Sequence, residues 1–96
     1  MYKIEISDSA IEDLVDIFEY TFINFGEKQW QKYNSIIDEN INSLTINPFI
    51  GHGRNDIPVN CLAWLVGDHF LIYRVEGSIV YLLRVLNQRM DFLLQF

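Results

Sequence analysis

Three short apolar runs near the end of the chain, separated by two turn dipeptides, restrict most strongly what this sequence can fold into. The runs cover residues 62–66, 69–76 and 79–86, and the dipeptides are Gly67-Asp68 and Gly77-Ser78. Glycine next to a small polar residue suits the two-residue turns that join antiparallel strands. The sequence therefore predicts a three-stranded antiparallel meander over residues 62–86.

One strand and two helices are predicted ahead of the meander. Residues 2–7 alternate with period two, which places Tyr2, Ile4 and Ile6 on one face of a strand. Ser9 and Glu12 fit a capping box that starts the first helix, which Gly26 would end. A second helix is predicted over residues 27–46, and the loop over residues 48–60 contains both prolines.

Apolar side chains recur at helical spacing in both predicted helices. The first set is Ile11, Leu14, Val15, Phe18, Phe22 and Phe25, and the second is Trp30, Tyr33, Ile36, Ile37, Ile41 and Leu44. Both stripes are expected to face the sheet, with the aromatic residues forming the core of the hairpin. The resulting fold class is α+β, a single domain over residues 1–96 with the order β-α-α-β-β-β. The helix hairpin packs on one face of a small, mainly antiparallel sheet.

The last two predicted strands are apolar on both faces. Phe70 and Ile72 oppose Leu71 and Tyr73, and Val80 opposes Tyr81. A sheet with one solvated face should alternate between apolar and polar residues. We therefore expect a partner to cover the face that the helices leave open.

Charge and cysteine content exclude several classes of protein. The net charge is −6, all carried by residues 1–50, because residues 51–96 hold four acids and four arginines. An acidic body argues against broad nucleic-acid binding. Cys61 is the single cysteine, so no internal disulfide forms, and it is interpreted as a small buried residue. No signal peptide or membrane span is recognised, which makes the cytoplasm the expected location.

The strand motifs at the end of the chain resemble those of a known family. The runs Phe70-Leu71-Ile72-Tyr73-Arg74-Val75 and Leu83-Arg84-Val85-Leu86-Asn87-Gln88-Arg89-Met90-Asp91 are similar to motifs of the ParE/RelE toxins of type II toxin–antitoxin systems. Asp13-Leu14, Ile17-Phe18-Glu19-Tyr20 and the loop with Gly51, Arg54 and Asp56 resemble the ParE branch. The resemblance covers nearly the whole chain.

The resemblance implies a small toxin that a cognate antitoxin, encoded by an adjacent gene, neutralises. ParE-like toxins inhibit DNA gyrase by binding, whereas RelE-like toxins cleave messenger RNA on the ribosome. The residues assigned to target or partner binding are Arg54, Arg74, Arg84, Arg89, Met90 and Asp91. Those assigned to an antitoxin groove are Phe18, Phe22, Trp30, Tyr73 and Tyr81.

Two interpretations of the arginines stay open. Arg74, Arg84 and Arg89 either pair internally with Asp56, Glu76 or Asp91, or present cations to a partner. Whether the first two share a face depends on the length of the turn at residues 76–78.

The sequence disfavours a nuclease and predicts neither a catalytic residue nor a cofactor. Ribosome-dependent cleavage would need a general acid, a general base and several cations, and His52, Arg54 and Tyr81 are a thin set for it. His52 and His69 lack a second ligand at metal-binding spacing, so no metal site is predicted. A further alternative is a non-toxic antitoxin-binding module, modestly favoured by the acidic charge, by His52 after Gly51, and by Asn87.

Overall fold

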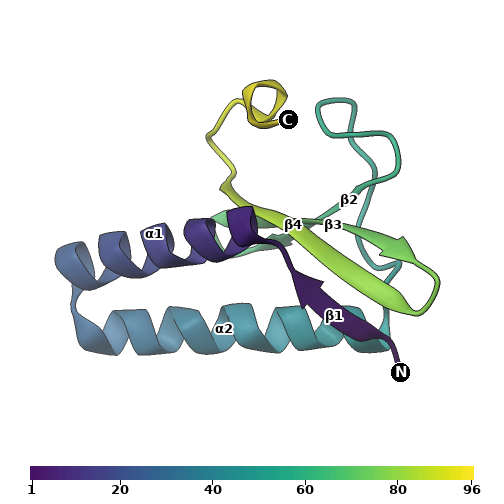
Figure 1. The fold of residues 1–96 in the computed structure, drawn as a ribbon. Helices are drawn as coiled ribbons and strands as arrows, with labels where there is room; N and C mark the ends of the chain where they lie inside the picture. Colours follow the sequence, from purple (N-terminus) through teal and green to yellow (C-terminus); the bar gives the residue numbers. More distant parts are fainter.

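Two helices, four strands and one short 3₁₀ turn make up the fold in a computed structural model that describes residues 1–96 (Figure 1). In chain order they are β1 (Lys3–Ile6), α1 (Asp8–Phe25), α2 (Glu27–Ile46), β2 (Leu62–Val66), β3 (His69–Glu76), β4 (Ile79–Asn87) and the turn η1 (Phe92–Gln95). The helix hairpin packs on one face of the sheet, so the predicted α+β fold and element order are confirmed. Neither helix has the length and hydropathy that a membrane span requires.

The sheet has the order β1-β4-β3-β2 and is antiparallel except at one edge, where β1 runs parallel to β4. The turns after β2 and β3 contain Gly67 and Gly77, whose φ angles are 58° and 59°. Most side chains are strained at such a positive φ, so glycine suits these tight turns. The predicted meander is confirmed, and Glu76 pairs with Ile79 across a two-residue turn.

A β-bulge decides which face of the sheet the arginines of β3 and β4 occupy. Arg74 pairs with Tyr81, but the register shifts between Ile72 and Tyr73, so that Ile72 pairs with Arg84. Residues paired across an antiparallel ladder share a face, as do alternate residues of one strand. Arg74 and Arg84 therefore lie on the same face, opposite to the one on which Tyr73 joins the helix-side core. Without the bulge, alternation along β4 would place Arg84 on the same face as Leu82, which belongs to the helix-side core.

Helix α1 begins two residues earlier than the sequence predicts, with Ser7 rather than Ser9 as its N-cap. The Ser7 hydroxyl accepts a hydrogen bond from the Ala10 amide at 3.0 Å and donates one to the Leu83 carbonyl at 2.7 Å. The capping box predicted at Ser9 and Glu12 is therefore wrong. Ser7 is favoured because its hydroxyl satisfies two backbone groups at once, an amide in the first turn of α1 and a carbonyl of β4 beyond the end of β1.

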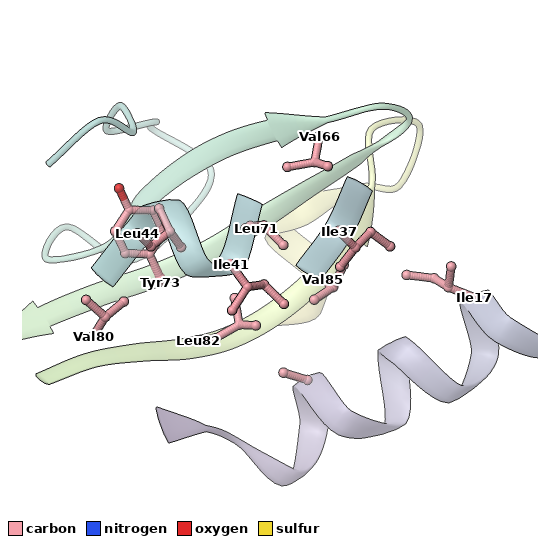
Figure 2. Close-up of a cluster of buried hydrophobic side chains, with 11 residues drawn as sticks. Ile17, Ile37, Ile41, Leu44, Val66, Leu71, Tyr73, Val80, Leu82 and Val85 are labelled. Carbon is pink, nitrogen blue, oxygen red and sulfur yellow. The ribbon is translucent and has the colours of Figure 1, made fainter. Parts of the chain in front are cut away.

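The core lies between the helix hairpin and the sheet. Its buried members are Ala10, Ile17, Ile37, Ile41, Leu44, Val66, Leu71, Tyr73, Val80, Leu82 and Val85 (Figure 2). The prediction for α2 is confirmed in that Ile37, Ile41 and Leu44 are buried. From the predicted first strand, Tyr2 and Ile4 pack against this core.

Helix α1 presents a different face to the core from the one predicted. Its buried residues are Ala10, Ile17 and Thr21. The residues expected in the core are instead exposed, at 48% for Ile11 and Val15, 38% for Phe18, 45% for Phe22 and 62% for Phe25. Of the predicted stripe, Leu14 alone packs against the core. The prediction for this helix is wrong because small residues at positions 10 and 21 let α1 lie close to β4, which turns the larger side chains outwards.

The chain itself covers the second face of the sheet. Ile72 and Leu86 are fully buried there, in a second cluster with Ile57, Cys61 and Phe92. The covering residues come from the loop before β2 and from η1, both on the side of the sheet away from α2 (Figure 1). The expectation that a partner must cover this face is therefore wrong, since the chain supplies its own apolar cover. Cys61 is buried, as predicted.

The loop before β2 is held to the sheet at its first residues. The Gly51 amide donates a hydrogen bond to the Tyr73 hydroxyl at 2.9 Å, and His52 and Ala63 exchange two backbone hydrogen bonds. A Cβ atom at residue 51 would lie 2.7 Å from that hydroxyl oxygen, so the close approach requires glycine. Tyr73 has no exposed surface, and its predicted place in an antitoxin groove is therefore wrong for this structure.

Candidate functional site

An open cleft of about 490 Å³ lies between α1, the start of β3 and the end of β4. Helix α1 contributes Asp13, Asp16, Ile17, Tyr20 and Thr21, and the first turns of α2 contribute Gln29 and Tyr33. Asp68 lines the cleft from the β2–β3 turn, and His69 from the start of β3. Asn87 at the end of β4 and the following Gln88-Arg89-Met90 line it as well. The cleft therefore joins residues that are far apart in the chain.

A hydrogen-bonded group centred on Tyr33 forms one wall of this cleft. The Tyr33 hydroxyl lies 2.6 Å from Nδ1 of His69 and accepts a hydrogen bond from the Asp68 amide at 3.2 Å. Burial lowers the pKa of His69, an effect that the nearby Asp68 and Asp13 carboxylates oppose. Burial also raises the pKa of Tyr33. The group ties the β2–β3 turn to α2, and the burial of His69 favours the neutral form of its ring.

Asp13 and Arg84 form the least exposed ion pair of the molecule, and Asp13 lines the same cleft. Nε of Arg84 lies 2.8 Å from one carboxylate oxygen of Asp13, and Nη2 lies 3.0 Å from the other. The Val85 amide donates a further hydrogen bond to Asp13 at 2.9 Å, and Arg84 donates to the Gln95 carbonyl at 3.2 Å. The hydrogen bond to Asp13 raises the pKa of Arg84. Arg84 therefore joins α1, β4 and η1, and its guanidinium group is already hydrogen-bonded within the chain.

Arg54 and Arg74 are also engaged within the chain. Arg54 makes two 2.7 Å hydrogen bonds to Asp56, whose pKa they lower, and its guanidinium lies 4.5 Å from the ring centroid of Phe92. Arg74 pairs with Glu76, and its guanidinium lies 4.3 Å from the ring centroid of Tyr81. The internal pairing that the sequence left open is thus observed for Arg74 and Arg84. For Arg84 the partner is Asp13 rather than a predicted acid.

Arg89 makes no ion pair, and it lines the cleft beside Met90. Both side chains are exposed. Asp91, the next residue, instead caps η1 by accepting a hydrogen bond from the Leu93 amide at 3.1 Å. Of the six residues assigned to target or partner binding, Arg89 and Met90 are therefore the two that lie together in a cleft with no partner inside the chain.

Three of the five residues assigned to an antitoxin groove lie together on the helix hairpin. The ring centroids of Phe18 and Trp30 are 4.8 Å apart, and those of Phe18 and Phe22 are 5.7 Å apart. Tyr73 is in the core, and Tyr81 lies on the sheet face away from the helices. The hairpin aromatics form a partly exposed apolar surface, and Tyr81 belongs to a different one.

Sequence reasoning missed most of the cleft. The sequence places Asp13 and Tyr20 in motifs of the first helix and Tyr33 in the apolar stripe of the second, without bringing the three together. His69 is hydrogen-bonded to Tyr33, and no spacing in the sequence pairs it with a tyrosine 36 positions away. The one usable signal was the Arg89-Met90 motif, which does reach the cleft.

The nuclease set considered from the sequence is not brought together. His52 and Arg54 line a shallow depression beside Trp64, Leu65 and Phe70. Tyr81 is not part of it, since its ring lies under Arg74. No group of three or more His, Cys, Asp or Glu side chains is arranged to hold a metal ion.

Two solved structures share this fold. A chain of the chromosomal ParDE TA system from P. aeruginosa matches with a TM-score of 0.78 and 20% identity, covering 91% of this chain and 96% of that one. The conserved hypothetical protein HP0894 from Helicobacter pylori matches with a TM-score of 0.59 and 19% identity, over 92% and 96% of the two chains. At these identities the matches show the shared fold.

Sequence comparisons define the family. The family model described as "ParE toxin of type II toxin-antitoxin system, parDE" matches residues 4–92. Toxin ParE1 from Mycobacterium tuberculosis, in strains CDC 1551 and H37Rv, is 32% identical over 87 residues, which cover 90% of this chain and 89% of the relative. The chain belongs to the ParE toxin family of type II toxin–antitoxin systems. The predicted ParE branch is therefore confirmed.

Proposed function

We propose that this protein is a toxin that acts by binding a target in the cytoplasm, DNA gyrase, and that an antitoxin encoded by an adjacent gene neutralises it. The observation that carries the antitoxin part is an apolar row along α1, which consists of Ile11, Val15, Phe18 and Phe22. This row is exposed although the helix already buries another face in the core. Contiguous exposed apolar surface marks sites of protein–protein contact.

The target-binding part rests on Arg89 and Met90. They line a cleft and have no partner inside the chain, whereas Arg54, Arg74 and Arg84 are paired. Arginine and methionine are both enriched at protein interfaces. Arg89→Ala is therefore expected to weaken target inhibition while antitoxin binding to the α1 row is kept.

Cleavage of messenger RNA is the alternative that the cleft disfavours. Asp16 and Asp68 line it without an ion-pairing base, and Arg89 is its one arginine. The lowered pKa of His69 leaves that ring neutral near pH 7. A cleft with this balance of charge repels a phosphodiester rather than stabilising its transition state.

A second candidate is a non-toxic module that binds an antitoxin and serves in autoregulation. It is favoured by the internal pairing of three of the four arginines, which leaves Arg89 as the single unpaired one. The net charge of −6 also favours this candidate, because it opposes binding to a target that includes DNA.

Induction of the gene, alone and together with its neighbour, tests the proposal. We expect growth arrest from the toxin alone and rescue by the neighbouring product. Supercoiling and cleavage assays with purified gyrase, run beside a ribosome-dependent cleavage assay, separate the targets. Growth without arrest, combined with tight binding to the neighbouring product, would favour the non-toxic module.

Variants of the α1 row test where the antitoxin binds. Val15→Ser with Phe22→Ser is expected to weaken antitoxin binding about tenfold or more, because buried aromatic side chains dominate interface energies. Ile23→Ser is the matched control, since Ile23 is exposed on the same helix but lies outside the row. Equal affinity for the double variant and the wild type would contradict this placement.

A further inference from the structure

The entire net charge of the protein is carried by the helix hairpin. Helix α1 contains five acids and no base, and α2 contains three acids and two lysines, so the hairpin carries −6, the same as the whole chain. The α1 acids are Asp8, Glu12, Asp13, Asp16 and Glu19. The sheet, the loops and the C-terminal turn together carry none.

These charges are not neutralised inside the molecule. Of the α1 acids, only Asp13 makes an ion pair, and Asp8, Glu12, Asp16 and Glu19 are all exposed. Four carboxylates on one helix without a base repel one another and create a negative potential along its outer side. Within the fold, the favourable contributions of these acids are the position of Asp8 at the helix N-terminus and the attraction between Glu12 and Arg84.

The acids also lie directly beside the apolar row. Residues three or four apart are neighbours on a helix surface. Ile11 is three residues after Asp8, Val15 lies between Glu12 and Glu19 at these spacings, and Phe22 is three residues after Glu19. When a partner covers the row, the polar residues that border its apolar surface must therefore lie next to these carboxylates.

We infer that the segment of the antitoxin that covers the α1 row is amphipathic, with apolar side chains bordered by lysine or arginine. The inference rests on the proposed antitoxin binding and adds the chemistry of the partner. Charges across an interface are arranged to be complementary, and like charges placed opposite each other cost several kcal/mol. A second copy of this chain does not fit, because it would bring its own acidic α1 against the same carboxylates.

The matching test uses a charge-neutralised pair and a control of equal charge change. Glu12→Gln with Glu19→Gln removes two carboxylates beside the row, and Glu5→Gln with Glu39→Gln removes two exposed carboxylates outside α1. The probe is the purified product of the neighbouring gene. Its association rate constant with each toxin is measured from low to high sodium chloride concentration.

Wild type and control are expected to lose about tenfold in association rate between low and high salt, because screening removes electrostatic attraction. The variant with Glu12→Gln and Glu19→Gln is expected to associate more slowly than the wild type at low salt. Its association rate should also depend on salt about half as strongly, since two of the four unpaired α1 carboxylates are gone. Equal salt dependence in all three proteins, or faster binding by that variant, would overturn the inference and leave antitoxin neutralisation intact. Self-association of the toxin through the row at low salt would overturn it as well. Absence of binding to the neighbouring product would overturn the proposed function itself, and this inference with it.

Discussion

At the scale of single residues, Asp13 connects α1 to β4 through three hydrogen bonds. It accepts two hydrogen bonds from Arg84 and one from the Val85 amide, although it is 71 positions away from Arg84 in the chain. The side chains of the pair are 13% and 20% exposed. Removal of either partner leaves the other charge partly buried and unpaired. The free energy of unfolding should therefore fall by more than it does when an exposed ion pair is broken.

Asp13→Ala is expected to lower the free energy of unfolding by about 2–4 kcal/mol, because Arg84 loses its partner and Val85 loses an acceptor. Urea unfolding measures the change. Arg74→Ala, which breaks a more exposed ion pair, is the control and should cost about 1 kcal/mol or less. Additive losses for Asp13→Ala and Arg84→Ala in the double variant would contradict the coupling.

His69 makes stability depend on pH in a defined direction. Burial lowers its pKa in the folded state, while Asp68 and Asp13 oppose that shift. Below the ordinary histidine pKa, the unfolded chain therefore binds more protons at this position than the folded chain does. Stability is kept above about pH 6.5 and falls as the pH drops from there towards the folded-state pKa.

His69→Gln is expected to remove that part of the pH dependence. The measurement is the free energy of unfolding at several pH values between about 5 and 7, where histidine titrates. The wild type should lose stability faster than the variant as the pH falls, and the two slopes should agree above pH 7. Parallel curves over the whole range would show that His69 does not contribute.

At the scale of the elements, α1 has one face buried in the core and one face that exposes apolar side chains. Ile17 is buried against the sheet, and Val15 is half exposed. Ile17→Ala should therefore lower the free energy of unfolding by about 2–4 kcal/mol, whereas Val15→Ala should change it by about 0.5 kcal/mol or less. Thermal or urea unfolding of both variants checks this. A larger loss of stability for Val15→Ala than for Ile17→Ala would contradict the observed orientation of α1 and support the one predicted from its hydrophobic pattern.

Most elements follow from the sequence, and their relative placement follows only in part. The turn dipeptides with Gly67 and Gly77 define the meander, and Asn47-Pro48 ends α2 where predicted. The orientation of α1 was missed because periodicity weights Phe18 and Phe22 above Ala10 and Thr21. Small residues decide how closely a helix can approach a sheet, which a count of large apolar residues does not register.

Long-range partners account for the rest of what the sequence did not predict. Nothing local indicates that η1 returns to cover the outer face of the sheet through Phe92. Likewise, the bulge at Ile72 and Tyr73 depends on the pairing of two strands rather than on either one. The cleft was missed for the same reason, since Tyr33, His69 and Arg89 come together only after the sheet has formed.

At the scale of the whole molecule, charge and exposed apolar surface oppose each other. The net charge of −6 keeps molecules apart at pH 7, and the sequence isoelectric point is about 4.6. Near that pH the repulsion disappears and the α1 row is free to associate. Light scattering of the free toxin should therefore rise as the pH falls from 7 to 4.6, and less so for Val15→Ser with Phe22→Ser. Constant scattering across this range would contradict the prediction.

The parallel pairing of β1 with β4 has a consequence for synthesis on the ribosome. Lys3 pairs with Ile79 and Ile6 with Leu82, so the first strand of the chain can join the sheet only after the last strand has been made. Domains fold as units while the chain emerges from its N-terminus, and contacts between distant residues form late. The helix hairpin is complete long before its sheet, and its core face stays uncovered until β4 has been translated. The protein therefore acquires its finished surface only after β4 has been translated, and a partner that contacts both the helices and the sheet binds no earlier.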